Sequence, residues 1–250
     1  MNIGWRWCTW MTLLLLFNVM SISISVSPSV VDHGNKISDS YIYGLCNANK
    51  YISGSEYERN LKKLLKSLVN GAAPSGGLAT HTYGGVQGLV QCRPDISRHE
   101  CQSCSAAASE RAFQGCPNAI SARVQFEFCF IRYENYTFAS VLDTSVAYSL
   151  ESSKSNSNIH GFNHTLANLM ATLARKAPLH VNRFATGAQV VKHSSVTVYG
   201  LQMCLTTLAA PDCRACLRQA IGLLNKCCSS EMGAQIYLGS CSVRFEIYPF

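Results

Sequence analysis

Five cysteines of this chain occur twice, and the second set follows the first by 112 residues at every position. Each set has the spacing C-x8-C-x2-C-x11-C-x12-C. One matched pair would mean little, but five matched spacings indicate an internal duplication. We therefore expect two homologous domains, copy one in residues 39–140 and copy two in residues 161–250. The paired positions are Cys92, Cys101, Cys104, Cys116 and Cys129, then Cys204, Cys213, Cys216, Cys228 and Cys241.

Residues 1–27 have the pattern of a secretory signal peptide. Arg6 provides the positive charge, Met11 to Met20 are apolar, and small residues follow from Ser21 to Ser27. The apolar run is shorter than the roughly 20 residues of a membrane span, although a retained anchor stays open as an alternative. No later segment is long and apolar enough to span. We expect a secreted, extracellular (apoplastic) protein without a membrane span after cleavage.

Signal cleavage would also make the cysteine count even. The chain has 13 cysteines, and Cys8 lies within the signal. An even number at repeated spacings in an exported chain is typical of disulfides. Zinc at the pairs Cys101/Cys104 and Cys213/Cys216 is the competing interpretation. Because zinc sites usually combine two such pairs or add a histidine pair, and each pair here stands alone, disulfides are favoured and no metal is expected.

Composition argues against several classes of function. The net charge is +7, but lysines and arginines form no dense stripe of the kind that binds nucleic acid. Histidines are scattered, and no G-x-S-x-G, H-E-x-x-H or phosphate-loop motif occurs. We predict a protein that is not an enzyme and needs no cofactor. An extracellular thiol oxidoreductase is the least favoured hypothesis.

Periodicity predicts the elements of copy one. Ser55 with Glu58, and Ser97 with Glu100, form capping boxes before apolar positions at helical spacing. Runs rich in β-branched and aromatic residues predict strands. The expected helices are 56–69 and 98–113, and the expected strands are 41–46, 80–83, 86–92, 122–131 and 133–138.

Copy two repeats this plan after a polar linker, placed at residues 141–160, that contains ESSKSNSN. Strands at both ends with helices between them predict an α+β fold, with two helices on an antiparallel sheet in each copy. One departure stands out. Copy two has no counterpart of Cys46 and instead carries Cys227 beside Cys228.

The doubled C-x8-C-x2-C motif, with the approach Tyr199-Gly200-Leu201-Gln202-Met203-Cys204, resembles the ginkbilobin-homologous domain of land plants. The tandem is similar to the cysteine-rich repeat secretory proteins, from about Asp39 to Phe250. The resemblance implies five-stranded sheets. It also implies the bridges Cys46–Cys116, Cys92–Cys101, Cys104–Cys129, Cys204–Cys213 and Cys216–Cys241. Cys227 and Cys228 are left to form a vicinal bridge, stay reduced or pair between chains.

The resemblance also implies a sugar site in copy one. The family binds mannose through an Asn after the first cysteine, an Arg before the last and a Glu after it, here Asn47, Arg123 and Glu134. Their amide, guanidinium and carboxylate groups suit vicinal hydroxyls, which donate and accept hydrogen bonds. The alternative is a cross-strand ion pair between Arg123 and Glu134. In either case we expect both side chains outside the core. In copy two, Gln235 stands at the position of Arg123, and no cysteine anchors a counterpart of Asn47. Only Glu246, the counterpart of Glu134, is retained.

These observations favour a secreted, lectin-like defence protein with antifungal activity, whose copy one binds mannose-type glycans such as those of fungal cell walls. The alternative is an extracellular interaction module without sugar binding, a partner of receptor ectodomains in stress or developmental signalling. Asn135 and Asn163 begin N-glycosylation sequons that fit the secretory route.

Overall fold

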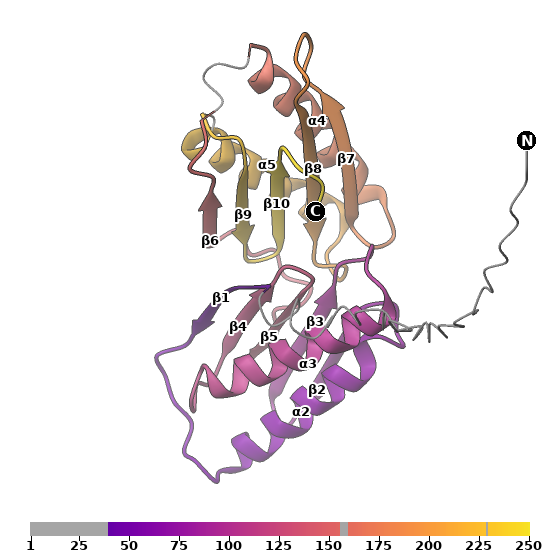
Figure 1. Ribbon diagram of the computed structural model, residues 1–250. Coiled ribbons are helices and arrows are strands. Elements are labelled where there is room, and N and C mark those ends of the chain that lie inside the picture. The colour runs from indigo at the N-terminus through magenta and orange to yellow at the C-terminus, as the bar shows by residue number, and fades with distance from the viewer. Residues whose placement is uncertain (1–39, 156–159, 229) are drawn as a thin grey trace, which may run out of the picture. The chain divides into compact units, whose positions relative to one another are not determined.

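The computed structural model describes residues 40–155, 160–228 and 230–250. The proposed signal, Cys8 and the start of copy one at residue 39 lie outside the described residues. The described residues of both copies belong to one compact unit. In each copy, two helices pack on a five-stranded antiparallel sheet, as expected (Figure 1). Within the described residues, no helix has the length and apolar character that crossing a membrane requires.

Copy one has the sheet order β1-β4-β5-β3-β2. Its five strands and two helices follow the expected order along the chain. Their bounds are β1 (Tyr41–Cys46), α2 (Glu56–Ala72), β2 (Leu78–Tyr83), β3 (Val86–Cys92), α3 (Arg98–Gln114), β4 (Ala122–Phe126) and β5 (Cys129–Glu134).

Copy two has the equivalent order β6-β9-β10-β8-β7. Its elements are β6 (Val146–Glu151), α4 (Phe162–Lys176), the short 3-10 helix η1 (Ala177–Leu179), β7 (Phe184–Val190), β8 (Thr197–Cys204), α5 (Ala210–Cys227), β9 (Ala234–Leu238) and β10 (Cys241–Glu246). The placement of residues 141–160 as a linker was therefore wrong, because β6 pairs with β9. This edge strand is largely exposed, so it lacks the alternation of apolar and polar residues that marks a half-buried strand.

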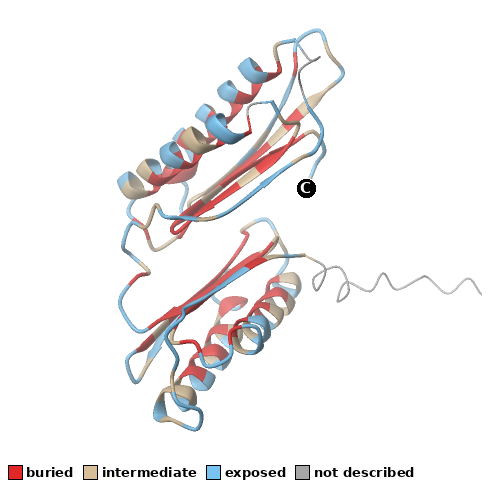
Figure 2. Cartoon of the chain, turned by 90° about the vertical axis from the view of Figure 1, so that its left-hand side faces the viewer, coloured by how far each residue is buried: buried red, intermediate tan, exposed pale blue. Residues whose placement is uncertain are grey.

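The helices begin where the capping residues predict. Ser97 accepts a hydrogen bond from the Glu100 amide at 3.2 Å, and the Glu100 side chain accepts one from the Ser97 amide at 2.8 Å. This reciprocal pair satisfies two amides that a helix start leaves without partners. Along α2, Leu61, Leu64 and Leu68 are completely buried. Figure 2 shows that buried residues follow the sheet-facing sides of the helices.

The closing hairpin of copy one differs from the expected strands 122–131 and 133–138. Its turn lies at Glu127-Phe128, between β4 and β5. This turn contains no Gly, Pro, Asn or Asp, so the aromatic and β-branched run continues through it without a turn signal. The corrected register places Arg123 opposite Arg132. The hypothesis of a cross-strand pair between Arg123 and Glu134 was therefore wrong.

The disulfides of copy one are Cys46–Cys116, Cys92–Cys101 and Cys104–Cys129. Copy two contains the equivalent bridges Cys204–Cys213 and Cys216–Cys241. This pairing is the one that the family resemblance implies. It places the two cysteines of each C-x-x-C pair in different bridges, so neither pair presents the thiolates that a zinc site requires.

The register of β6 explains the departure in copy two. Glu151 lies opposite Ala234, as Cys46 lies opposite Ala122 in copy one. Glu151 thus occupies the position of Cys46, and Cys228, the counterpart of Cys116, is bonded to its neighbour Cys227. Among the described residues, these three form the one group with metal-ligand spacing. Both sulfurs are in a disulfide and offer no thiolate.

Candidate functional site

The sugar site suggested by the sequence lies where β1 and β5 of copy one end and β4 begins. Asn47 follows β1, Arg123 lies on β4 and Glu134 ends β5, and these strands are adjacent in the sheet. All three residues line one cleft of about 250 Å³. Arg132, Asp143 and the residues from Ser145 to Ala147 complete its wall. The structure therefore brings the three residues together.

Asn47 is exposed, and two hydrogen bonds, one from its backbone amide and one to its side chain, fix its position. Its amide donates to the Ser121 carbonyl at 3.0 Å, and its side-chain oxygen accepts from the Asn49 amide at 2.7 Å. The neighbouring bridge from Cys46 to Cys116 fixes the end of β1. No hydrogen bond among the described residues uses the Asn47 side-chain nitrogen, so this donor is available to a ligand.

Glu134 is buried, with 7% of its surface exposed, and its charge is compensated by Arg132. Arg132 Nε donates to Glu134 Oε1 at 2.7 Å, and Arg132 Nη1 donates to Asp143 Oδ2 at 3.2 Å. Burial by itself would raise the pKa of the Asp143 carboxyl. Hydrogen bonds from Ser145 and the charges of Arg123 and Arg132 outweigh burial, so this pKa lies below its usual value. The wall of the cleft is therefore a charged network.

Arg123 is also buried, at 7% exposure, so it and Glu134 lie outside the apolar cores, as expected, but neither is an exposed side chain. Its Nη2 donates to the Gly239 carbonyl of copy two at 2.8 Å and lies 3.7 Å from Asp143 Oδ2. Its guanidinium also packs on the Phe130 ring, at 5.4 Å from the ring centroid. Burial lowers the pKa of Arg123. This residue thus links the two copies as well as lining the cleft.

Copy two makes a reciprocal contact through an arginine at a different position. Gly239 is in the β9–β10 turn, and its counterpart in the β4–β5 turn of copy one is Glu127. Arg244 of copy two donates through Nη1 to Glu127 Oε1 at 2.9 Å and through Nε to Glu246 Oε1 at 3.1 Å. Each copy therefore contributes an arginine that binds the hairpin turn of the other.

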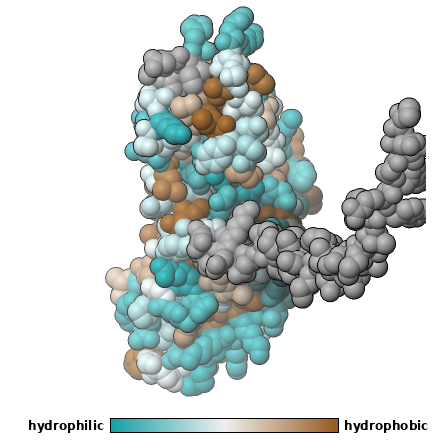
Figure 3. Space-filling view, in the orientation of Figure 1, coloured by the Kyte–Doolittle hydropathy of each residue, from teal (hydrophilic) through white to brown (hydrophobic). Residues whose placement is uncertain are grey.

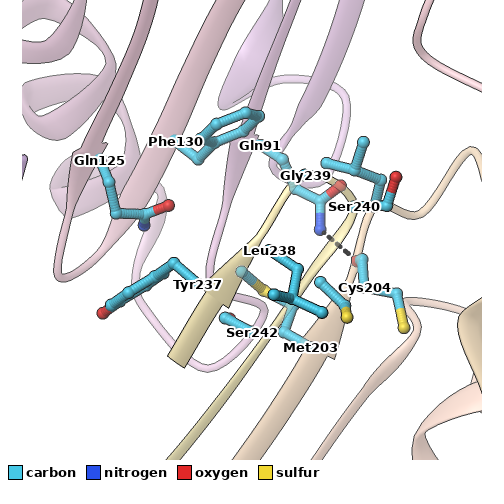
Figure 4. A pocket seen from close by; sticks show the side chains of 12 residues that line it. Gln91, Gln125, Phe130, Met203, Cys204, Tyr237, Leu238, Gly239, Ser240 and Ser242 are labelled. Atoms are coloured by element: carbon cyan, nitrogen blue, oxygen red, sulfur yellow. Dashed lines mark hydrogen bonds between the residues drawn. The ribbon is translucent and has the colours of Figure 1, made fainter. Parts of the chain in front are cut away.

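Further buried polar groups join the copies. Gln91 donates to the Cys204 carbonyl at 2.9 Å and accepts from the Thr206 amide at 2.8 Å; Figure 4 shows the Gln91 amide directed at Cys204. The cavity beside these residues is only about 30 Å³, roughly the volume of one water in the liquid. The Tyr43 ring lies 5.2 Å from the Tyr148 ring. These contacts are close-packed and leave no room for a ligand.

This second role of the sheet residues is not apparent from the sequence. Arg123 and Gln125 alternate along β4, and Arg132 and Glu134 alternate along β5, as polar residues do on a solvated face. All four are buried. The duplication was the available signal, because two similar sheets can cover each other's polar faces.

The other predicted residues lie beside the cleft or in copy two. Gln235 donates to Glu246 Oε1 at 3.5 Å and accepts from the Tyr237 hydroxyl at 2.5 Å. Asn135 is exposed directly after Glu134, and Asn163 is exposed in the first turn of α4. A glycan at Asn135 would be attached next to the cleft of copy one.

Comparisons with known proteins agree with this architecture. A family model described as salt stress response/antifungal matches residues 45–136 and 149–248. Cysteine-rich repeat secretory protein 38 of Arabidopsis thaliana is 31% identical and aligns over 95% of this chain and 96% of its own. The antimicrobial ginkbilobin-2-like protein of Castanea crenata is 32% identical and aligns over 84% of this chain and 88% of its own.

The fold has a crystallographic relative. The tandem DUF26 ectodomain of the Arabidopsis thaliana cysteine-rich receptor-like protein PDLP8 superposes with a TM-score of 0.74 at 29% identity, over 84% of this chain and 98% of that ectodomain. The match includes both copies. The chain belongs to the salt stress response/antifungal (DUF26) family, as a tandem, non-enzymatic protein of the cysteine-rich repeat secretory type.

Proposed function

We propose that this protein is exported and acts as an antifungal lectin whose copy one binds mannose-type glycans. The convergence of Asn47, Arg123 and Glu134 in one cleft carries this proposal. The antifungal family model and the antimicrobial relative of Castanea crenata support antifungal activity as the biological outcome. Fungal cell walls are the proposed source of the glycan.

The groups left for a sugar have complementary chemistry. Asn47 offers an amide donor, and Glu134 keeps Oε2 as an acceptor, since Arg132 uses Oε1. Arg123 Nη1 makes a long contact of 3.5 Å to the Leu238 carbonyl, and the Arg123 side chain also interacts with Tyr43. Vicinal hydroxyls of a hexose can accept from the two donors and donate to the carboxylate. The cleft is open and wet, so monosaccharide affinity should be near millimolar, about −4 kcal/mol.

Asn47→Ala provides the clean test, because this side chain is exposed and outside the contacts between the copies. Losing one directed hydrogen bond costs about 1 to 1.5 kcal/mol, so mannose affinity should fall by roughly tenfold. The measurement is a mannose titration followed by NMR on unglycosylated protein, which removes any obstruction from a glycan at Asn135. Gln235→Ala in copy two is the control and should bind mannose like the wild type.

Two results would refute the lectin proposal. One is a wild-type spectrum without shifts near Asn47 at tens of millimolar mannose, roughly ten times the expected dissociation constant. The other is an Asn47→Ala protein that binds as well as the wild type. Arg123→Ala is a poorer test, since it also removes the bond to Gly239.

An interaction module without sugar binding is the second candidate, and the occupied donors of Arg123 favour it. Under this second proposal, the cleft residues stabilise the contact between the two copies, and the protein binds a receptor ectodomain. Figure 3 shows small, separate hydrophobic patches on the visible described surface, so polar contacts would have to dominate such a complex. A glycan array separates the candidates: specific mannose-type signals support the lectin, and their absence with retained ectodomain binding supports the module.

A further inference from the structure

The positive charge of this chain is concentrated in copy two. Residues 162–227, from the start of α4 to the end of α5, contain seven lysines and arginines and a single carboxylate, Asp212. The equivalent residues 56–114 of copy one, from α2 to α3, contain seven basic and five acidic residues. The segment of copy two therefore carries +6, against +2 in copy one, on a chain of net charge +7.

Four of these cations are exposed and have no carboxylate partner. Arg175 and Lys176 end α4, and Arg214 and Arg218 lie one turn apart on α5. Figure 2 shows that the helices carry their exposed residues on the side away from the sheet. The ion pairs among the described residues include none of the four. Their charge is therefore available to an anionic surface.

Two aliphatic side chains project into solvent directly after the cations that end α4. Leu179, the last residue of η1, is 73% exposed, and Val181 is 76% exposed. The corresponding residues after α2 in copy one are 73–77, with the sequence APSGG, which has no large apolar side chain. Because η1 packs against α5, the cations of both helices surround this segment. We call residues 175–183 the η1 corner.

The backbone of the η1 corner is held in place by Arg183. Its Nη1 donates to the carbonyls of Pro178 at 2.9 Å and His180 at 3.1 Å, and its Nε donates to the Leu208 carbonyl at 3.1 Å. The two aliphatic side chains are thus exposed on a fixed turn. A turn that is already ordered loses little conformational entropy when it binds a partner.

We propose that the η1 corner binds membranes that contain anionic phospholipids. Leu179 and Val181 enter the boundary between headgroups and acyl chains, and the neighbouring cations bind the lipid phosphates. Exposed aliphatic residues flanked by lysine and arginine are the combination that interfacial binding uses. An acidic polysaccharide would engage the charges but leave both aliphatic side chains in water, so lipid is favoured. The inference does not rest on the mannose proposal, because its residues belong to the other copy.

The test is flotation of the mature, disulfide-bonded chain with lipid vesicles, made of phosphatidylcholine alone or of phosphatidylcholine mixed with phosphatidylserine. The protein must lack residues 1–27, because their apolar run would itself favour lipid. We expect binding to the mixed vesicles, no detectable binding to phosphatidylcholine alone, and weaker binding as salt is added. Equal binding to both vesicles, or binding to neither, would overturn the proposal.

The double variant Leu179→Ser with Val181→Ser tests insertion. Both side chains are exposed, so the fold should not change, and loss of their burial in lipid should lower vesicle affinity by roughly tenfold. The control is Val190→Ser, which removes an apolar side chain that is 60% exposed at the end of β7. It should bind like the wild type. Unchanged affinity in the double variant would contradict the proposal.

A second pair of variants tests whether the charges act locally. Arg175→Gln with Lys176→Gln should lower vesicle affinity by about fivefold for each charge removed. Lys63→Gln with Lys66→Gln removes the same charge from exposed positions on α2 of copy one and should have a much smaller effect. Equal losses in the two variants would show that net charge alone attracts the protein, and the assignment to the η1 corner would be wrong.

A polygalacturonate titration separates lipid from acidic polysaccharide. If polygalacturonate binds, the Leu179→Ser and Val181→Ser variant binds it equally well, and vesicles are not bound, the corner is a polysaccharide site and the lipid proposal is wrong. Vesicle binding that depends on the two aliphatic side chains supports lipid. Asn47→Ala should float with the mixed vesicles like the wild type, so failure of the mannose site and failure of this proposal remain distinguishable.

Discussion

Replacing Cys46 and Cys116 by serine should destabilise copy one by about 4.4 kcal/mol, the largest loss expected for any of its bridges. The reason is loop length. This bridge has a sequence separation of 70, against 9 for Cys92–Cys101 and 25 for Cys104–Cys129. A longer loop restricts the unfolded chain more, and the same estimate gives about 2.7 and 3.5 kcal/mol for the shorter loops.

Equilibrium urea unfolding of the mature chain measures this loss. The chain's three tryptophans, Trp5, Trp7 and Trp10, lie in the proposed signal, so circular dichroism and assigned NMR signals must report unfolding. The matched control is the double variant Cys227→Ser with Cys228→Ser. Because these residues are adjacent, their bridge closes no long loop, and the expected cost is about 1 kcal/mol or less. Equal losses in the two double variants would contradict the loop-length argument.

Glu134→Ala should destabilise copy one by about 3 kcal/mol, because it leaves the buried guanidinium of Arg132 without its nearest carboxylate. The expected value is at the low end for a broken buried pair, since Asp143 remains 3.2 Å from Arg132 Nη1. The comparison variant is Glu110→Ala, which removes an exposed contact with Gln114 one turn away on α3. That loss should be below about 0.5 kcal/mol.

Urea midpoints of both variants, at unchanged m-value, provide the measurement. If Glu134→Ala costs no more than Glu110→Ala, the Arg132–Glu134 pair does not stabilise the fold. The double variant Arg132→Met with Glu134→Leu adds a second check, because replacing a buried pair by apolar residues is often neutral or stabilising. It should recover much of the loss.

Local signals in the sequence were sufficient for much of the architecture. The repeated cysteine spacing predicted two domains, because a duplicated disulfide framework constrains each copy in the same way. Ser55 and Ser97 predicted where the helices begin, since a capped start depends on neighbouring residues alone. The family resemblance then implied that Asn47, Arg123 and Glu134 meet, and the order β1-β4-β5 places them in one cleft.

Other features were decided by tertiary structure. The turn at Glu127-Phe128 contains no residue that favours turns. It is stabilised instead by the pairing of β4 with β5 and by the contact with Arg244 of the other copy. The exposed edge strand β6 is visible only through its pairing with β9, which places Glu151 at the position of Cys46. Hydrogen bonding to a partner strand requires no apolar pattern.

The burial of Arg123 and Glu134 depends on which surface covers them. Alternating polar residues on a strand indicate a face away from an apolar core, and the sequence determined that much correctly. In this protein that face is occupied by contacts between the copies, where Arg123 binds the Gly239 carbonyl and Arg132 pairs with Glu134. Sequence periodicity distinguishes polar from apolar faces, but a polar face is solvated or buried according to what packs on it, and only the tertiary structure decides that.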